Sequence, residues 1–283
     1  MNDASFYLLR YSCPLFVADR HRQTVQLVGT SIPIKADERE FLLTAQHVLD
    51  YHDPDEILYP IDREGESIVG FGNDFIGVAR ATVPDDDGND DADLGVLELP
   101  PGRLSRAYVP VPRYMIGASI TLKHVDTISL IGYPITKNKY RPRSRTNILK
   151  SVALEIPHAR SKYDALGLNP ITHFCARFNH KGMKAPDGRG FVPFKPQGMS
   201  GGPAWFIPER ARRLGTDEGA SLLGVVSEYN AEHNVIWGPR LTYALLSFAD
   251  AYPELSDSFA ILKRLRTCDP EEARYFLQAT KDV

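Results

Sequence analysis

The chain has 283 residues, of which 43% are hydrophobic and 24% charged, and its formal net charge is −3. This length and composition suit one large β unit or two smaller domains with full cores. The small net charge excludes a protein that binds nucleic acid or anionic membranes through its overall charge, and no apolar run approaches the roughly 20 residues of a membrane span. We therefore expect neither nucleic acid nor a membrane as a partner.

The first residues and the cysteines bear on the cellular compartment. Residues 1–6 show no basic segment leading into a long apolar run, so a standard export signal is not expected. The three cysteines, Cys13, Cys175 and Cys268, are too few for a disulfide framework and lack the spacing of a zinc site, which favours buried free thiols. Both features predict a protein of the reducing cytoplasm with no bound metal.

The N-terminal part predicts a strand hairpin. Residues 1–24 are expected to form an extension, and their apolar stretch, residues 6–16, fits either a strand or a helix. Residues 24–31 alternate as a strand does, and residues 40–45 form the expected returning strand.

A histidine and an aspartate stand at the ends of apolar strands. His47 comes directly after the returning strand, in the sequence Thr-Ala-Gln-His, and Asp93 opens the apolar segment 94–99. A neutral imidazole has an ordinary pKa near ~6.5, so it can accept a proton at neutral pH. Asp90 and Asp91 are nearby acids, but the strand follows Asp93 directly. The structural alternatives are an ordinary surface or core histidine and an aspartate that caps a turn.

The loop before Asp93 is strongly acidic over residues 85–91. An EF-hand register with Gly88 at the glycine position places Val83 and Leu94 at the first and last ligand positions, and neither side chain can bind Ca²⁺. A solvated loop is therefore expected, with loose Ca²⁺ binding as the alternative.

The second half of the chain again alternates strands and loops. The proline-rich residues 100–112 are expected to link two β units. Further strands are expected at residues 127–134, 147–157, 171–179, 204–207 and 222–229. The basic run 137–145 is interpreted as a solvated loop, with an anion or nucleic-acid patch as the alternative. From Pro253 the pattern becomes helical, and Asp269-Pro270 is a strong helix start.

The stretch Gly198-Met199-Ser200-Gly201-Gly202-Pro203 carries the third candidate. Glycine allows a sharp turn that other residues reach only at a cost, and amide N–H groups in such a turn can converge to stabilise an oxyanion. Ser200 is therefore a candidate nucleophile if a base lies nearby. A glycine-rich surface turn is the alternative.

These three segments, taken in order, resemble the chymotrypsin/trypsin-like serine peptidases, of the prokaryotic cytoplasmic type. Asp93 follows His47 by 46 residues and Ser200 follows Asp93 by 107, and the resemblance covers roughly residues 25–250. It implies an all-β fold of two six-stranded antiparallel Greek-key β-barrels with a C-terminal helical tail. The implied divisions are residues 1–24 for the extension, 25–112 for the first barrel with its linker, 113–250 for the second barrel and 251–283 for the helices.

The resemblance also implies a serine endopeptidase that needs no cofactor and acts on a protein or peptide substrate. Ser200 would attack the peptide carbonyl, His47 would carry the proton and Asp93 would orient His47. The amides of Gly198 and Ser200 would form the oxyanion hole.

The specificity pocket is less well defined by the sequence. The resemblance places Phe194 at the start of the pocket floor and Ser227, Glu228 and Tyr229 along one wall. The floor position carries no acid, so cleavage after Lys or Arg is not indicated, and a small or apolar substrate residue is expected. Glu228 could add charge to the pocket.

One departure from the family concerns activation. In animal trypsin relatives the residue before the serine is an aspartate that binds a newly freed N-terminus. Here this residue is Met199, which cannot hold an ammonium group. We expect a site that is formed constitutively or controlled by a regulatory protein partner.

Two other classes remain as alternatives. The serine turn also fits the Gly-x-Ser-x-Gly pattern of α/β-hydrolase esterases, for which Asp217 and His233 would supply the acid and the base. The serine of that fold must begin a helix, and Pro203 beside two glycines disfavours this. The other alternative is a catalytically latent peptidase-like module that acts by binding a partner. A peptidase restricted to one protein target, within a stress-response or antiviral system, is a hypothesis about its role.

Overall fold

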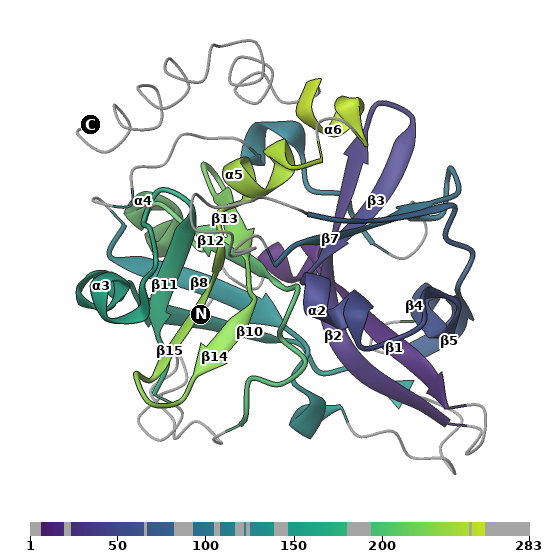
Figure 1. Ribbon diagram of the computed structural model, residues 1–283, viewed down its shortest axis with the longest axis horizontal. Helices are drawn as coiled ribbons and strands as arrows, with labels where there is room; N and C mark the ends of the chain where they lie inside the picture. The colour runs from purple at the N-terminus through teal and green to yellow at the C-terminus, as the bar shows by residue number, and fades with distance from the viewer. Residues whose placement is uncertain are drawn as a thin grey trace.

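The computed structural model describes residues 7–19, 24–64, 67–81, 93–104, 108–116, 122, 125–138, 147–179, 194–248 and 251–257. Within these ranges the fold is mostly β, with three antiparallel sheets and a few short helices (Figure 1). Among the described helices, none is both long and apolar enough to cross a membrane. The expectations for the acidic loop 85–91, most of the basic run 137–145, Cys268 and the helix at Asp269 fall outside the described residues.

Eight strands form the first sheet, and every neighbouring pair is antiparallel. In spatial order they are β6 (Gly77–Arg80), β7 (Gly95–Leu99), β3 (Arg39–Thr44), β2 (Thr24–Ala36), β1 (Cys13–Asp19), β4 (Ile57–Glu64), β5 (Ser67–Gly72) and β9 (Asn147–Ile148). The region expected as an N-terminal extension therefore supplies β1, which lies inside the sheet between β2 and β4. Leu15 and Phe16 are buried there, and their burial explains why this stretch is apolar.

Seven strands form the other two sheets. In spatial order the second sheet contains β10 (Val152–Pro157), β8 (Thr127–Gly132), β12 (Pro203–Phe206) and β13 (Ser221–Val225). The third contains β11 (His173–Arg177), β15 (Val235–Pro239) and β14 (Glu228–Asn230). Isolated bridges between His158 and Ala176 and between Gly224 and Arg240 join these two sheets. The two six-stranded barrels stay a prediction, because the described strands are divided among three sheets and no closed barrel is found among them.

The expected continuous strand over residues 222–229 is interrupted. β13 ends at Val225 and β14 begins at Glu228, and the two strands belong to different sheets. Between them Val226 exchanges backbone hydrogen bonds with Gly201 and Gly202, and the Ser227 N–H donates to the Trp237 carbonyl at 3.0 Å. This change of sheet brings Ser227 against the loop that carries Ser200.

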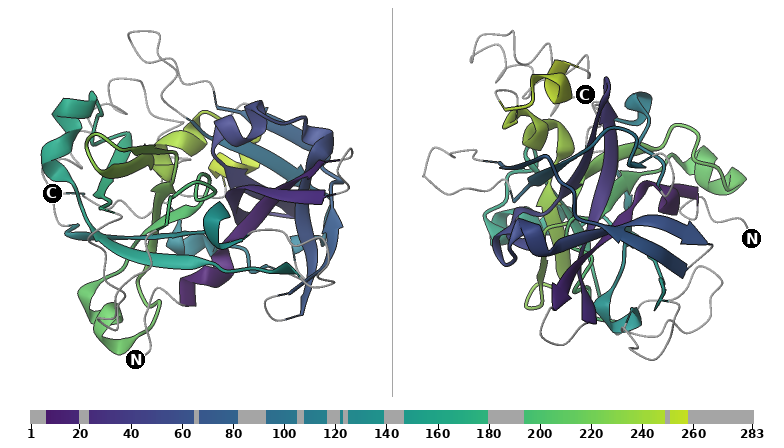
Figure 2. Two further views of the ribbon diagram at one scale, coloured as in Figure 1. Left: turned by 90° about the horizontal axis from the view of Figure 1, so that it is seen from below. Right: turned by 90° about the vertical axis from the view of Figure 1, so that its right-hand side faces the viewer.

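Within the described ranges, five short α-helices accompany the sheets. They are α2 (Gln46–Asp50), α3 (Tyr163–Leu166), α4 (Glu209–Leu214), α5 (Leu241–Leu246) and α6 (Pro253–Asp257). In Figure 1 the eight-stranded sheet lies on the right and the two smaller sheets on the left, and the left view of Figure 2 separates the same two groups. Helix α2 lies on the side of the first group that faces the second.

Strand β3 illustrates why the strands around the site are apolar without alternation. Phe41 and Leu43 pack into one buried cluster and Leu42 into another, so both faces of the strand are covered. Burying one such side chain contributes roughly 1.5–3 kcal/mol. The first of these clusters also takes in Trp205 and Leu222 from the second group of strands, and this shared core holds the two groups together.

Candidate active site

His47 is held by the junction between β3 and α2. Ala45 is extended and fully buried, and the helix then begins at Gln46. Val48 and Leu49 are buried against the first sheet, so the short helix is anchored beside the strand end. Gly95 on β7 makes room for this contact, because a Cβ atom there would lie 2.4 Å from Leu49 Cδ1. The sequence thus fixes His47 to a rigid part of the fold.

Asp93 forms two hydrogen bonds with His47. Its Oδ2 lies 2.7 Å from His47 Nδ1, and its Oδ1 accepts the His47 backbone N–H at 2.9 Å. The Ser227 hydroxyl also donates to Oδ2. Since an ionised carboxylate can only accept, Nδ1 carries the proton and Nε2 keeps its lone pair. This is the tautomer that a general base requires.

The two charges shift each other's pKa in the direction that favours this arrangement. Burial acts to lower the pKa of His47, but the hydrogen bond and negative charge of Asp93 outweigh it, so the pKa lies above its ordinary value of 6.5. Burial acts to raise the pKa of Asp93, but hydrogen bonds from His47 and Ser227 hold it below its ordinary value of 3.8. Asp93 is therefore ionised at neutral pH, and His47 is a stronger base than a free imidazole.

The loop that carries Ser200 depends on its glycines. Gly198 and Gly201 have φ angles of 90° and 85°, which side-chain-bearing residues rarely adopt. A Cβ on Gly201 would lie 1.9 Å from the Thr30 carbonyl oxygen, so the loop approaches β2 too closely for a side chain. Met199 is fully buried beneath the loop, in the core of the second group of strands.

The loop leaves two amide groups available. Within the described part of the chain, the N–H groups of Gly198 and Ser200 have no hydrogen-bond acceptor, whereas those of Met199, Gly201 and Gly202 are bonded to carbonyl oxygens. Two unpaired amides, one of the serine itself and one two residues before it, can receive a developing negative charge. The resemblance implied the same two amides for an oxyanion hole, and that role stays a prediction.

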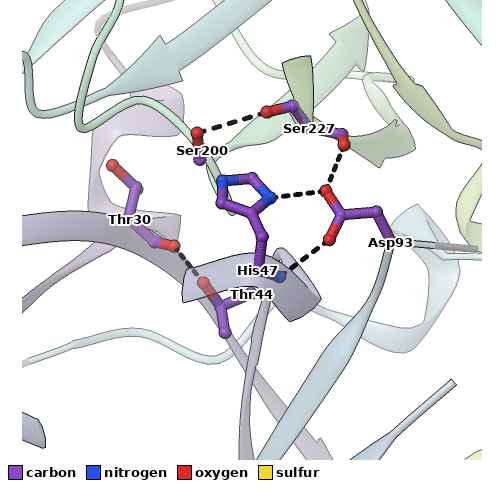
Figure 3. A network of polar contacts seen from close by, with 6 residues as sticks. All are labelled: Thr30, Thr44, His47, Asp93, Ser200 and Ser227. Atoms are coloured by element: carbon purple, nitrogen blue, oxygen red, sulfur yellow. Dashed lines mark hydrogen bonds and ion pairs between the residues drawn. The ribbon is translucent and has the colours of Figure 1, made fainter. Parts of the chain in front are cut away.

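The Ser200 hydroxyl points toward the segment between β13 and β14 in this structure. It donates to the Ser227 carbonyl oxygen at 3.2 Å. In Figure 3 the His47 ring lies between Asp93 and Ser200, with the ring nitrogen opposite the carboxylate on the side of Ser200. Rotation about the Cα–Cβ bond of Ser200 would turn the hydroxyl toward that nitrogen, and such contacts often tighten only when substrate is bound.

Ser227 has a role that the sequence did not indicate. The sequence placed it only in a pocket wall, whereas its hydroxyl donates to Asp93 and its carbonyl accepts from Ser200. No local signal could have revealed this, because the contact joins residues 134 positions apart in the chain. It arises from the break between β13 and β14.

A cleft of about 560 Å³ opens beside these residues. It is lined by His47, Tyr51, Asp93, Pro196, Gln197, Ser200, Val226, Ser227, Glu228, Tyr229, Ile236 and Trp237. The structure thus brings the three proposed catalytic residues together with Ser227, Glu228 and Tyr229. Phe194 does not line the cleft; it is buried and packs edge-to-face on Phe178, with ring centroids 5.9 Å apart.

The residues that the α/β-hydrolase hypothesis requires do not lie together at this cleft. Asp217 pairs with Arg10 at 2.5 Å, and neither Asp217 nor His233 lines the cleft. Ser200 is followed not by a helix but by the short turn that leads into β12. As for metals, the ranges described above contain no group of three or more His, Cys, Asp or Glu side chains placed to hold an ion.

Comparison with known proteins identifies the fold alone. No family model matches the sequence, and no curated protein matches it. The structure is similar to the crystal structure of the scabies mite inactivated protease paralogue S-I1, with a TM-score of 0.53 and 14% sequence identity over 87% of this chain and 95% of that chain. This similarity is consistent with a trypsin-like all-β fold, and because that paralogue is inactivated it carries no argument for catalysis.

Proposed function

We propose that the protein is a serine endopeptidase that hydrolyses peptide bonds through an acyl-enzyme. The observation that carries the proposal is the hydrogen-bonded pair of His47 and Asp93, which lines one cleft together with Ser200, whose loop carries two amides without a hydrogen-bond acceptor among the described residues. We also propose that the two groups of strands correspond to two β-barrels and that the protein acts in the cytoplasm, where thiols outside disulfides, such as those of the buried Cys13 and Cys175, persist.

In the proposed reaction, Ser200 Oγ bonds to the carbonyl carbon of the substrate while His47 Nε2 takes the hydroxyl proton. The carbonyl oxygen becomes an oxyanion and is stabilised by the N–H groups of Gly198 and Ser200. The C–N bond then breaks, and His47 gives its proton to the departing amine. A water molecule releases the acyl group by the same two steps, with His47 again as base and then as acid, and Asp93 stays ionised throughout.

The substrate is proposed to be an extended segment of a protein. β14 is the edge strand of its sheet in the described structure, and Glu228 and Tyr229 on it line the cleft. An edge strand leaves backbone groups free to pair with a bound peptide. A restricted protein target and a regulatory partner remain part of this proposal.

A second candidate function is a latent module that binds a peptide without cleaving it. The orientation of the Ser200 hydroxyl toward the Ser227 carbonyl, instead of toward His47, favours this candidate. The two candidates share the cleft and differ in whether Ser200 is an activated nucleophile.

Labelling with a fluorophosphonate separates these candidates. We expect the folded protein to be labelled on Ser200 alone, as mapped by mass spectrometry of its peptides, because only an activated serine reacts rapidly with this probe. The urea-unfolded protein is the control and should remain unlabelled. A folded protein that is not labelled, or is labelled elsewhere, would refute the peptidase and leave the binding module.

Glu228 gives the cleft a charge preference that can be tested. It is exposed, has no ion-pair partner among the described residues, and stands in a cleft whose lining includes no Lys or Arg. We expect peptides with a Lys or Arg near the scissile bond to be cleaved a few-fold faster than matched peptides with Glu, because an exposed pair contributes up to about 1 kcal/mol. Glu228→Lys should reverse the order.

The control for this prediction is Glu232→Lys, which makes the same charge change at an exposed residue outside the cleft lining. The measurement is kcat/KM for a peptide set that differs at one position at a time. If Glu228→Lys and Glu232→Lys change the ranking equally, the effect belongs to the net charge and Glu228 does not select substrates.

A further inference from the structure

Thr30 lies where the two groups of strands meet, and it makes several hydrogen bonds across that boundary. Its hydroxyl donates to the Gly198 carbonyl oxygen at 2.7 Å and accepts the Tyr133 N–H at 3.1 Å. Its backbone N–H donates to the Ser200 carbonyl oxygen at 2.8 Å. On the other side, the Thr44 hydroxyl donates to the Thr30 carbonyl oxygen at 2.8 Å, as Figure 3 shows.

The hydrogen bonds of Thr30 add to others that hold the Ser200 loop, which carries the two unpaired amides. The Gly198 N–H belongs to a peptide unit whose carbonyl, on Gln197, accepts from Ile135 at 2.8 Å, and the Ser200 N–H belongs to a unit whose carbonyl, on Met199, accepts from Gly202 at 2.8 Å. Thr30 holds the two remaining units, through the carbonyls of Gly198 and Ser200. Four successive peptide units are thus held by their carbonyl groups.

The hydroxyl is the chemically specific part of this arrangement. Thr30 is fully buried, and its Oγ1 donates to one backbone group while it accepts from another. Serine and threonine alone offer a short side chain with both capacities. Valine has nearly the same shape and neither capacity, so it would leave the buried Gly198 carbonyl without this donor.

We propose that Thr30 is a positioning residue that sets the direction of the Gly198 and Ser200 amides and links the His47 side of the site to the Ser200 side. Thr30 does not touch the substrate; it acts through the loop. The inference rests on the proposed function, because the amides matter for catalysis only if they receive an oxyanion. Restraint of such donors before reaction is what makes them effective.

The adjacent residue provides a matched control. Ser31 is also fully buried on β2, and its hydroxyl donates to a backbone carbonyl, that of Cys13, at 3.0 Å. Cys13 is on β1, so this bond lies within the first sheet and leaves the Ser200 loop untouched. Ser31→Ala therefore reports the loss of a buried hydroxyl beside Thr30 without a change in the loop.

The experiment compares Thr30→Val, Thr30→Ser and Ser31→Ala with the wild type, after thermal melting shows that each is folded. The measurements are the second-order rate of labelling by a fluorophosphonate and kcat and KM for p-nitrophenyl acetate, which need no knowledge of the natural substrate. We expect Thr30→Val to label and turn over about 10- to 100-fold more slowly, below the roughly 10²–10³-fold loss seen when an oxyanion donor is removed outright. KM should change little, and Thr30→Ser and Ser31→Ala should stay within about three-fold of the wild type.

An NMR measurement of the backbone tests the positioning role of Thr30 independently of the proposed peptidase activity. The amide ¹⁵N–¹H resonances of Gly198 and Ser200 should shift in Thr30→Val and return in Thr30→Ser, whether or not the protein turns over. If the wild type is not labelled but the resonances shift in Thr30→Val and return in Thr30→Ser, the proposed peptidase activity is refuted, whereas the proposal that Thr30 positions the loop is supported. If Thr30→Val leaves the resonances in place, or if the wild type is labelled and Thr30→Val slows the labelling no more than Ser31→Ala does, the inference about Thr30 is overturned.

Discussion

Replacing Ser200 with alanine is expected to lower peptide hydrolysis by about six orders of magnitude, the loss found when the nucleophile of another serine peptidase is removed. The reason is that the change deletes the atom that forms the acyl-enzyme. Binding of peptide should persist, because the wall residues Glu228 and Tyr229 remain in place. Turnover of a cleaved peptide, with binding of the same peptide measured by calorimetry, tests both halves of this prediction.

Ser200→Ala should fold as well as the wild type. Among the described residues the hydroxyl makes a single, partly exposed hydrogen bond, to the Ser227 carbonyl, so the free energy of unfolding should change by no more than about 1.5 kcal/mol. Hydrolysis that continues at the wild-type rate in the folded variant would show either a contaminating peptidase or a different nucleophile, and in both cases Ser200 would lose its role.

Asp93→Asn is expected to lower kcat by about 10⁴-fold while the protein stays folded. An asparagine cannot accept from Nδ1, Ser227 and the His47 backbone as the carboxylate does, and it offers an N–H₂ group that favours the wrong tautomer of His47. The imidazolium that forms during the reaction would also lose its negative partner. Steady-state kinetics on a cleaved peptide measures the loss.

The same variant should move the pH profile. Only neutral His47 can act as the base, so kcat/KM rises as pH increases through the pKa of His47, which lies above 6.5 in the wild type. Without the charge of Asp93 this pKa falls, and the acidic limb of the profile should shift to lower pH. Titration of kcat/KM for both proteins between pH 5 and 9 measures the shift, on a range chosen around the ordinary pKa of about 6.5.

Asp74→Asn is the matched control for Asp93→Asn. Asp74 also accepts from a hydroxyl, that of Tyr59 at 2.6 Å, and pairs with Arg103 at 2.5 Å, but it does not line the cleft. Its replacement should cost stability and leave the acidic limb in place. If the two variants lower kcat equally and neither moves the limb, Asp93 supports the fold and does not orient His47.

The elements of the fold show where sequence reasoning works. Alternation at β2, and apolar runs bounded by turn signals at β3, β8, β10 and β11, predicted strands there, because burial of one or both faces of a strand is written in its own residues. The position of β1 was not predictable from its residues. An apolar stretch of this length fits a strand or a helix, and only its pairing with β2 and β4 decided between them.

In the candidate site, too, some features could be predicted from the sequence and others could be seen only in the structure. The sequence alone singled out His47, Asp93 and Ser200, in this order, as candidate catalytic residues and predicted a sharp glycine turn around Ser200, because a reactive side chain and a sharp turn are local properties. Only the tertiary structure decided that Ser227 contacts Asp93, that Thr30 holds the Ser200 loop and that Phe194 is packed away from the cleft. These are contacts between segments far apart in the chain, and their geometry is set by how the sheets pack, which no local pattern of residues encodes.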